Sequence, residues 1–431
     1  MIFEELNFPD GIHLLARWQA NDPAAIERLK VIFDATIKGD HDKFFSYPAP
    51  QDAVHVCGPV DLLTLTIVHR LFGLTSEEFY KGGPERFVRT SLMTQKLLGL
   101  PKHYISWPVY GLTAEALGQE MIYSDQYSPG TDPDNPMCNP DNWRDVTTPS
   151  MNAGIPQMLD RVLDCYQELT GLSPVLHLSA AYSLAADIFG QEQIIAALSH
   201  EPAFVNDFVD HLVDKVLQPW IEHFFSRYPD GWVELSDASG SPFFIGPENC
   251  KNVAIRSTQR LVTENPWGSR VYDANYRGDY VTTVKKRSTS SSRRRNPRKE
   301  KSANIGLLEL FKLKNSVCPD YVIRLAEDRT PIDFYVEQAI KCEIPLFMGI
   351  GATVIDRNSI ANIEIAKQEI ETMTSEYVDA IKTVATSIAA NGYESRTLPW
   401  PGTVYFEDIS AESSFDLLEI IVGTTLDQGT L

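Results

Sequence analysis

The chain has 431 residues, of which 43% are hydrophobic and 22% charged, and its formal net charge is −20. These proportions are typical of a globular protein, and the negative balance argues against general binding to nucleic acid or anionic membranes. No apolar run approaches the roughly 18 residues that a membrane span requires. The first residues lack the uninterrupted apolar core of a signal peptide. We therefore expect a cytoplasmic protein that does not bind membranes.

The cysteines are spaced far apart, and no two of them form a CxxC pair. They are Cys57, Cys138, Cys165, Cys250, Cys318 and Cys342. In a chain of this length, such spacing favours reduced thiols over a disulfide framework.

The first hundred residues are expected to be mainly helical. Apolar residues recur at helical spacing over 24–38, and Gly39 follows as a helix-ending residue. A short strand-like run begins near position 52 and leads into an apolar, helix-like stretch. Residues 76–100 again predict helix. Residues 124–150 are dense in Pro, Asp and Asn, which predicts a long irregular excursion.

From about residue 155 onward, short apolar strands are expected to alternate with helices. The predicted strands have the sequences PVLHLSA, GWVELSD, SRVYDAN and IPLFMGIG. A long helix from Ile360 to about Ala390 should end at Asn391-Gly392, a common helix terminator. Strands that are apolar on both faces and separated by helices indicate parallel βα units.

One segment opposes the acidic balance of the chain. Residues 285–301 hold nine Lys or Arg and one Glu, a local charge of +8, so the remainder carries about −28. Three interpretations remain open. The segment is a flexible solvated insertion, an arm that docks an acidic partner protein, or a nucleic-acid-binding tail. Nucleic acid is the least expected partner, because the body of the chain is so acidic.

Four segments resemble, in their order, motifs of the uroporphyrinogen decarboxylase superfamily, including its corrinoid-dependent methyltransferase branch. They are VYGLTAEALGQEMIY, LSAAYSLAADIFGQEQ, GWVELSDASGSPFFIGPENC and PLFMGIGATVIDRNSI. The resemblance implies an α/β fold, a (β/α)8 TIM-type barrel with an N-terminal helical extension and a long basic loop insertion. Residues 1–105 would form the extension and the first barrel elements, and 106–431 the barrel body. Residues 282–304 would be the flexible insertion. The active site would lie at the carboxyl ends of the strands.

Departures from the family pattern indicate which branch the chain resembles more. Decarboxylases of the family bind substrate carboxylates through an arginine-rich segment near the start, where this chain offers only Arg17. Thiol-activating methyltransferases of the family hold zinc through a mid-chain His-x-Cys and a late Cys. Here no histidine follows His223 and no cysteine follows Cys342. The pattern therefore favours relatives that demethylate ethers, amines or similar substrates.

Asp237 is the first candidate catalytic residue. It ends the strand GWVELSD, and a carboxylate at the carboxyl end of a parallel barrel strand points into the site. The alternative is that Asp237 caps the following helix or turn. Glu234 lies on the opposite pleat face, so we expect it to pack inside the barrel or to pair with a basic group.

Asp273 and Asn275 are the other candidate catalytic residues. They stand where the resemblance places the zinc-binding His-x-Cys of thiol-activating relatives, and alternate residues of a strand face the same side. They would orient a substrate oxygen, bind a hard cation such as Mg²⁺ or Ca²⁺, or stabilise a turn. Whether a metal is bound stays open. Arg277, in the loop that follows, is a weaker candidate for substrate binding.

Further candidates for substrate binding are His177, Glu115, Gly349 and Gly351. His177 lies in an apolar strand and is either a hydrogen-bonded core histidine or an acid/base group. Glu115 belongs to the segment in which the family places a carboxylate near the cavity mouth, unless it is a surface helix residue. The two glycines follow a strand directly, so they would admit a planar ligand or a phosphate, or form a tight turn.

From these features and the resemblance, we predict that the chain is a methyltransferase. It would move a methyl group between a small methylated substrate and the cobalt of a corrinoid. The corrinoid (cobalamin) would sit on a partner protein, because the chain has no DxHxxG-like signature for binding it. A carboxylic acid, or a metal held by carboxylates, would then protonate or polarise the leaving oxygen. The alternatives are a decarboxylase of a tetrapyrrole or small carboxylate, and a non-catalytic cofactor-binding or scaffold protein.

Overall fold

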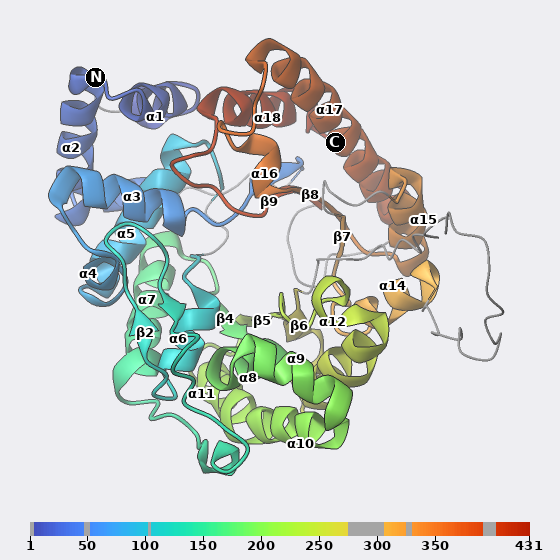
Figure 1. Ribbon diagram of the computed structural model, residues 1–431. Coiled ribbons are helices and arrows are strands. Elements are labelled where there is room, and N and C mark those ends of the chain that lie inside the picture. The colour runs from blue at the N-terminus through green and yellow to red at the C-terminus, as the bar shows by residue number, and fades with distance from the viewer. Residues whose placement is uncertain (1–3, 47–51, 102–104, 275–305, 325–329, 391–401) are drawn as a thin grey trace, which may run out of the picture.

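The computed structural model describes residues 4–46, 52–101, 105–274, 306–324, 330–390 and 402–431. In these ranges, helices surround short strands that run parallel to one another (Figure 1). The predicted site residues Asn275 and Arg277 and the basic segment 285–301 lie outside the described residues.

Seven of the described strands pair in parallel and form two sheets. They are β1 (His55–Cys57), β4 (Val175–Ser179), β5 (Trp232–Ser236), β6 (Val271–Asp273), β7 (Val322–Arg324), β8 (Leu346–Ile350) and β9 (Gly402–Phe406). One sheet has the order β1-β9-β8-β7 and the other the order β4-β5-β6. β2 (Met121–Ile122) and β3 (Gly130–Thr131) form a separate antiparallel pair. β2 lies just before the stretch 124–150 that was expected to be irregular, and β3 lies inside it.

Helices connect the strands and cover their outer side. The N-terminal third contains α1 (Asp10–Gln19), α2 (Pro23–Ile37), α3 (Asp61–Phe72), α4 (Ser76–Lys81), α5 (Pro84–Leu97) and α6 (Val109–Glu115). The middle contains α7 (Gly154–Thr170), α8 (Ala181–Phe189), α9 (Gln191–His200), α10 (Pro202–Leu212), α11 (Gln218–Arg227), α12 (Pro242–Asn249) and α13 (Arg256–Thr263). The last part contains α14 (Leu307–Asn315), α15 (Ile332–Cys342), α16 (Ala352–Ile355), α17 (Ile363–Ala390) and α18 (Phe415–Gln428). None of the helices in the described ranges combines the length and the apolar character that crossing a bilayer would require.

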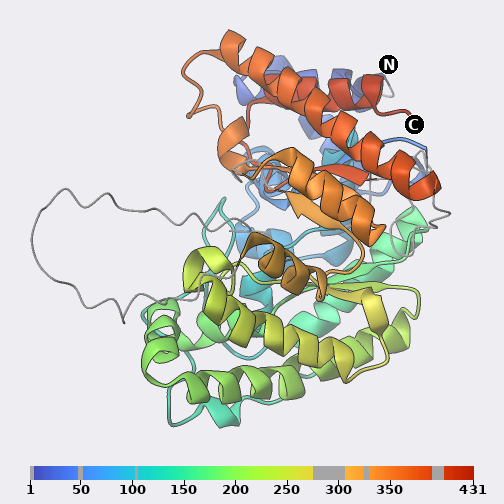
Figure 2. The same cartoon turned by 90° about the vertical axis from the view of Figure 1, so that its right-hand side faces the viewer.

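The two sheets are arranged as arcs around a common interior (Figure 1). The long helix α17 packs along the outer side of β8 and β9, and α18 packs beside α17 (Figure 2). The strand pairings thus establish an α/β fold with parallel sheets, as the alternation of strands and helices predicted. Closure of the two arcs into one eight-stranded barrel stays a prediction.

The period-two rule sorts the side chains of each strand onto two faces. On β5, Val233 and Leu235 are fully buried in the main core between sheet and helices. Glu234 and Ser236 face the other way and remain partly exposed. Register aligns His177 of β4 with Glu234 of β5, and Glu234 with Tyr272 of β6. A polar row therefore crosses the sheet on its inner face.

We expect substitution of Gly402 to test how tightly β9 is held. A Cβ atom added at Gly402 would lie 2.6 Å from the Leu346 carbonyl oxygen on β8 and 2.5 Å from Ile381 Cγ2 on α17. Gly402→Ala should therefore lower the free energy of unfolding by about 1–3 kcal/mol, as overpacking does. Gly130→Ala is the control, because nothing lies within 4 Å of the added atom. Equal melting temperatures for the two variants in thermal unfolding would contradict this packing.

Candidate functional site

A cavity of about 410 Å³ opens beyond the carboxyl ends of β1, β4, β5, β6 and β9. We call it the mouth cavity. Its lining combines acidic, aromatic and small side chains, which are Pro59, Asp61, Leu62, Ser106, Trp107, Pro108, Val109, Tyr110, Ser128, His177, Glu234, Ser236, Ala238, Ala274, Tyr405, Glu407 and Asp408. Parallel strands bring their carboxyl ends to one edge, and α/β proteins bind ligands at that edge.

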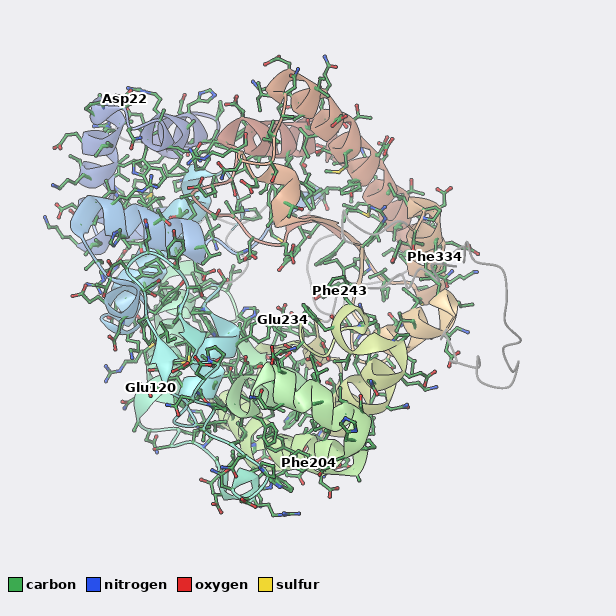
Figure 3. The ribbon with its side chains drawn as sticks, viewed as in Figure 1. Asp22, Glu120, Phe204, Glu234, Phe243 and Phe334 are labelled. Carbon is green, nitrogen blue, oxygen red and sulfur yellow. The ribbon has the colours of Figure 1, made fainter. Side chains whose placement is uncertain are left out.

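An imidazole and a carboxylate from neighbouring strands lie side by side in this cavity. His177 Nδ1 is 3.5 Å from Glu234 Oε1, and only 4% of the His177 side chain is exposed, against 19% for Glu234. Tyr272 donates a hydrogen bond from its hydroxyl to Glu234 Oε2 over 3.2 Å. The Trp107 ring meets the His177 ring edge to face, with 5.2 Å between the centroids. In Figure 3, Glu234 lies toward the interior that the strands enclose. Strand register thus fixes an oriented His–Glu pair, as expected for Glu234.

Asp61 supplies a second buried carboxylate to the mouth cavity. It is the first residue of α3 and is only 6% exposed. Its oxygens accept hydrogen bonds from Ser106 Oγ at 2.7 Å and from the Tyr80 hydroxyl at 2.9 Å. Burial raises the pKa of Asp61, and the two hydrogen bonds oppose that rise. Asp61 is therefore held in place by groups that also stabilise its charged form.

The end of β9 brings two more carboxylates to the rim. Tyr405 lies within the strand, and Glu407 and Asp408 follow it. The Glu407 backbone N–H donates to the Ile350 carbonyl, and its side chain accepts from the Ala352 N–H at 3.4 Å. The mouth cavity is therefore lined by four carboxyl side chains. Neither Lys nor Arg occurs among its described lining residues.

Asp237 lies directly behind the cavity wall and not in its lining. It is 1% exposed, and its Oδ1 accepts from Ser183 Oγ at 2.6 Å and from the Gly240 N–H at 3.0 Å. The neighbouring Ala238 N–H donates to the hydroxyl of Tyr110, a residue of the lining. Asp237 thus shapes the turn after β5, and its predicted catalytic role stays a prediction.

A second carboxyl group, Asp187 of α8, lies near Asp237. Burial raises the pKa of Asp187 to about 7, and repulsion from Asp237 adds to the rise. Burial raises the pKa of Asp237 to about 6, against the lowering effect of its hydrogen bonds with Ser183 and Gly240. One oxygen of each carboxyl, Oδ2, is buried without a hydrogen-bond partner among the described residues. The pair is therefore under electrostatic strain when both members are ionised.

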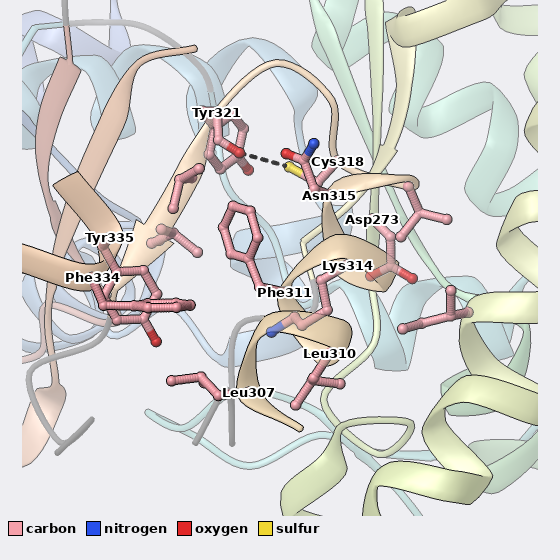
Figure 4. Close-up of a pocket in the computed structure, with 14 residues that line it drawn as sticks. Asp273, Leu307, Leu310, Phe311, Lys314, Asn315, Cys318, Tyr321, Phe334 and Tyr335 are labelled. Carbon is pink, nitrogen blue, oxygen red and sulfur yellow. Dashed lines mark hydrogen bonds between the residues drawn. The ribbon is translucent and has the colours of Figure 1, made fainter. Parts of the chain in front are cut away.

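Asp273 faces the helices and not the mouth cavity. Its side chain accepts a hydrogen bond from Thr258 Oγ1 of α13 at 3.1 Å. It borders a separate pocket of about 40 Å³, which Phe311, Cys318 and Tyr335 also line (Figure 4). Such a volume holds about one or two water molecules. A direct role of Asp273 toward a substrate in the mouth cavity is therefore not supported by its position.

The remaining predicted residues border the site at different distances. Gly349 pairs in register with Tyr405, and Gly351 precedes α16, whose first N–H contacts Glu407. Both glycines thus flank the rim. Glu115 sits at the far end of α6, where it pairs with Lys81 at 2.8 Å and accepts from the Tyr123 hydroxyl. It is absent from the described lining.

The structure adds lining residues that the sequence analysis did not propose. Trp107, Tyr110 and Tyr405 contribute aromatic rings, and Asp61, Glu407 and Asp408 contribute carboxylates. The sequence FED at 406–408 resembles the sequence SD at 236–237. In both places an acidic residue follows directly after an apolar strand. That signal would have found Glu407 and Asp408 if β9 had been recognised.

No group of three or more His, Cys, Asp or Glu side chains in the described ranges is arranged to hold a metal ion. All six cysteines are free, and five of them are buried, in line with the prediction of reduced thiols.

The stability of the fold should depend on pH through Asp187 and Asp237. Their folded pKa values exceed the 3.8 of an unperturbed Asp, so the folded state holds more protons. The stability that these two carboxyl groups contribute is fully present below about pH 4 and is lost as pH rises through about 7. Asp187→Asn removes one member of the pair, so the melting temperature of the variant relative to the unmodified protein should rise between pH 5 and pH 8. A constant difference across that interval would contradict the assignment.

Comparison with known proteins finds a likeness in fold. No family model matches the chain, and no curated protein matches it. Among solved structures, the chain is similar to a methyltransferase from Methanosarcina mazei, with a TM-score of 0.56 and 12% sequence identity. The match covers 91% of this chain and 96% of that one. The chain therefore shares a whole-length fold with a methyltransferase.

Proposed function

We propose that this chain is a methyltransferase that moves a methyl group between a small methylated substrate and the cobalt of a corrinoid. The observation that carries the proposal is the mouth cavity. It lies at the carboxyl edge of the parallel strands, within a fold that is shared along nearly its whole length with a methyltransferase. The proposal also rests on the sequence resemblance to the corrinoid-dependent branch.

The mouth cavity suits a small substrate and does not enclose a corrinoid. Its volume of about 410 Å³ is near the lower end of the range for sites of drug-sized ligands. A corrin ring with its side chains is larger than such ligands. The described residues therefore do not fit a corrinoid inside the cavity. We assign the corrinoid to a partner protein that would meet the cavity from outside.

The residues of the chain itself can bind and orient the methylated group. Glu234 is held by Tyr272 and His177, and Asp61 by Tyr80 and Ser106, so both carboxylates have fixed positions. Such preorganisation costs no rearrangement when substrate binds. The His177–Glu234 pair can also hold a proton beside a leaving atom that requires one.

The decarboxylase alternative has less support from the site. Substrates of that class carry several carboxylates, which would meet the four acidic side chains of the lining. Arg17, the one arginine in a comparable place of the sequence, lies on α1 in an exposed ion pair with Asp22 at 2.8 Å. It does not belong to the described lining.

Replacement of Glu234 tests whether methyl transfer takes place in the mouth cavity. Glu234→Gln keeps the shape of the side chain but removes its charge and weakens the hold on His177. We expect kcat/KM for methyl transfer between reduced cobalamin and a methyl donor to fall about 10- to 1,000-fold. The transfer is followed by the change in cobalamin absorbance.

The matched control is Glu419→Gln, because Glu419 lies on α18 in an exposed pair with His13. This control should retain full activity. If Glu234→Gln also retains full activity in a protein that turns over, the mouth cavity is not the site of transfer.

A further inference from the structure

We propose that Tyr110 is the hydrogen-bond donor of the mouth cavity and selects ligands that place a neutral acceptor atom, such as a carbonyl oxygen, against its hydroxyl. The inference deepens the proposed function, because it names a specificity-determining residue of the same cavity. It rests on the proposed function only in taking the mouth cavity as the substrate site, and it involves no step of methyl transfer.

The hydroxyl oxygen of Tyr110 is held at the wall of the cavity. Tyr110 lies on α6 and lines the mouth cavity, and its oxygen accepts a hydrogen bond from the Ala238 backbone N–H at 3.0 Å. Ala238 also belongs to the lining, so this bond places the hydroxyl beside the cavity. A tyrosine hydroxyl carries one proton that it can donate. No group among the described residues accepts that proton, so it is left for a ligand.

The hydroxyl of Tyr110 keeps its proton at neutral pH. Burial raises the pKa of Tyr110 well above the ordinary value for a tyrosine. The hydrogen bond from Ala238 opposes that rise, and repulsion from the Asp237 carboxylate adds to it. Tyr110 therefore meets a ligand as a neutral donor, and its acceptor side is already taken by the backbone. A ligand that only donates hydrogen bonds gains nothing from this hydroxyl.

The other N–H and O–H groups of the lining side chains are less selective. The hydroxyl of Ser106 donates its proton to a carboxylate of the lining at 2.7 Å. The indole N–H of Trp107 is a donor too, but its nitrogen is buried and does not open onto the cavity. The hydroxyls of Ser128 and Ser236 line the cavity, yet a serine hydroxyl rotates and either donates or accepts. Tyr110 is therefore the group in the described lining that distinguishes acceptors from donors.

The turn after β5 orients the group that holds Tyr110. Asp237 Oδ1 accepts from Ser183 Oγ at 2.6 Å and from the Gly240 N–H at 3.0 Å, so the turn is closed around one carboxylate. A Cβ atom at Gly240 would lie 2.3 Å from Asp237 Oδ2, which shows how closely the backbone approaches. Ala238 lies inside this turn, and the direction of its N–H is fixed with it. Asp237 and Ser183 are thus positioning residues for Tyr110.

The experiment compares two neutral aromatic probes on the full-length protein. Acetophenone and α-methylstyrene have nearly the same shape, but the first carries a carbonyl oxygen where the second carries a CH₂ group. Isothermal titration gives the ratio of the two dissociation constants, in which the shared ring contacts cancel. Tyr110→Phe should lower the preference for acetophenone about twofold to tenfold, the worth of one neutral hydrogen bond. Tyr127→Phe is the control and should keep the preference, because Tyr127 is 69% exposed and outside the described lining.

A second variant tests the positioning by the turn. Ser183→Ala removes the hydroxyl that holds Asp237, so it should lower the preference for acetophenone about twofold to fivefold. In the Tyr110→Phe background it should have no further effect on the preference, because both changes act through the same hydroxyl. A purely structural role of Ser183 would weaken both probes equally and leave the ratio unchanged. Tyr110→Phe decides the donor role even where Ser183→Ala fails to fold.

The same preference in Tyr110→Phe and in the unmodified protein, or no saturable binding of either probe, would overturn the inference. Methyl transfer to reduced cobalamin together with an unchanged preference in Tyr110→Phe would keep the proposed function and reject the donor role. A preference that Tyr110→Phe lowers, in a protein that transfers no methyl group to reduced cobalamin from any tested donor, would support the donor role and reject the proposed function.

Discussion

The site depends on the parallel register of β4 and β5. Because His177 stands opposite Glu234 in that register, their side chains emerge on the same inner face and meet at 3.5 Å. A shift by one residue would turn Glu234 toward the helices and bring Leu235 to the cavity. The fully buried Val233 and Leu235 prevent that shift, since they would lose their places in the core. The hydrophobic outer face of β5 therefore fixes the chemistry of its inner face.

Burial of charge imposes a second constraint on the carboxyl edge. Buried carboxylates are costly unless hydrogen bonds compensate them. Asp61 has two such bonds, whereas Asp187 and Asp237 each keep one oxygen without a partner among the described residues. Asp187 and Asp237, behind the lining of the mouth cavity, are thus less fully hydrogen-bonded than Asp61 within it. This difference separates Asp61, whose oxygens are held by two hydrogen bonds, from Asp187 and Asp237, whose pKa values burial raises to about 7 and about 6.

Much of the fold could be predicted from the sequence because helices and apolar strands have distinct periodicities. The strands at Val175–Ser179, Trp232–Ser236 and Leu346–Ile350 follow the predicted runs. β9 was missed, since its five residues start at a glycine and follow a long stretch without a clear pattern. With β9 unrecognised, Tyr405, Glu407 and Asp408 could not be placed in the site.

The predicted site residues do not all lie in the mouth cavity. Asp237 follows β5 and Asp273 ends β6, yet both side chains turn to the helices, where Ser183 and Thr258 hold them. Which face a strand-terminal residue takes depends on the strand's parity and on the turn that follows, and sequence alone does not fix the turn. His177 lines the mouth cavity beside Glu234, because a polar residue in an apolar strand must find a partner on one face. Its role in substrate binding stays a prediction.

The distribution of the thiols has a practical consequence. Cys342, the last residue of α15, is the only one of the six cysteines that is exposed. Burial raises the pKa of four of the others, which are Cys57, Cys138, Cys165 and Cys318. Cys250 is completely enclosed. A maleimide dye should therefore attach at one defined position of the unaltered protein, on the outer layer of helices. Binding of a candidate partner protein could then be followed by fluorescence without engineering the chain.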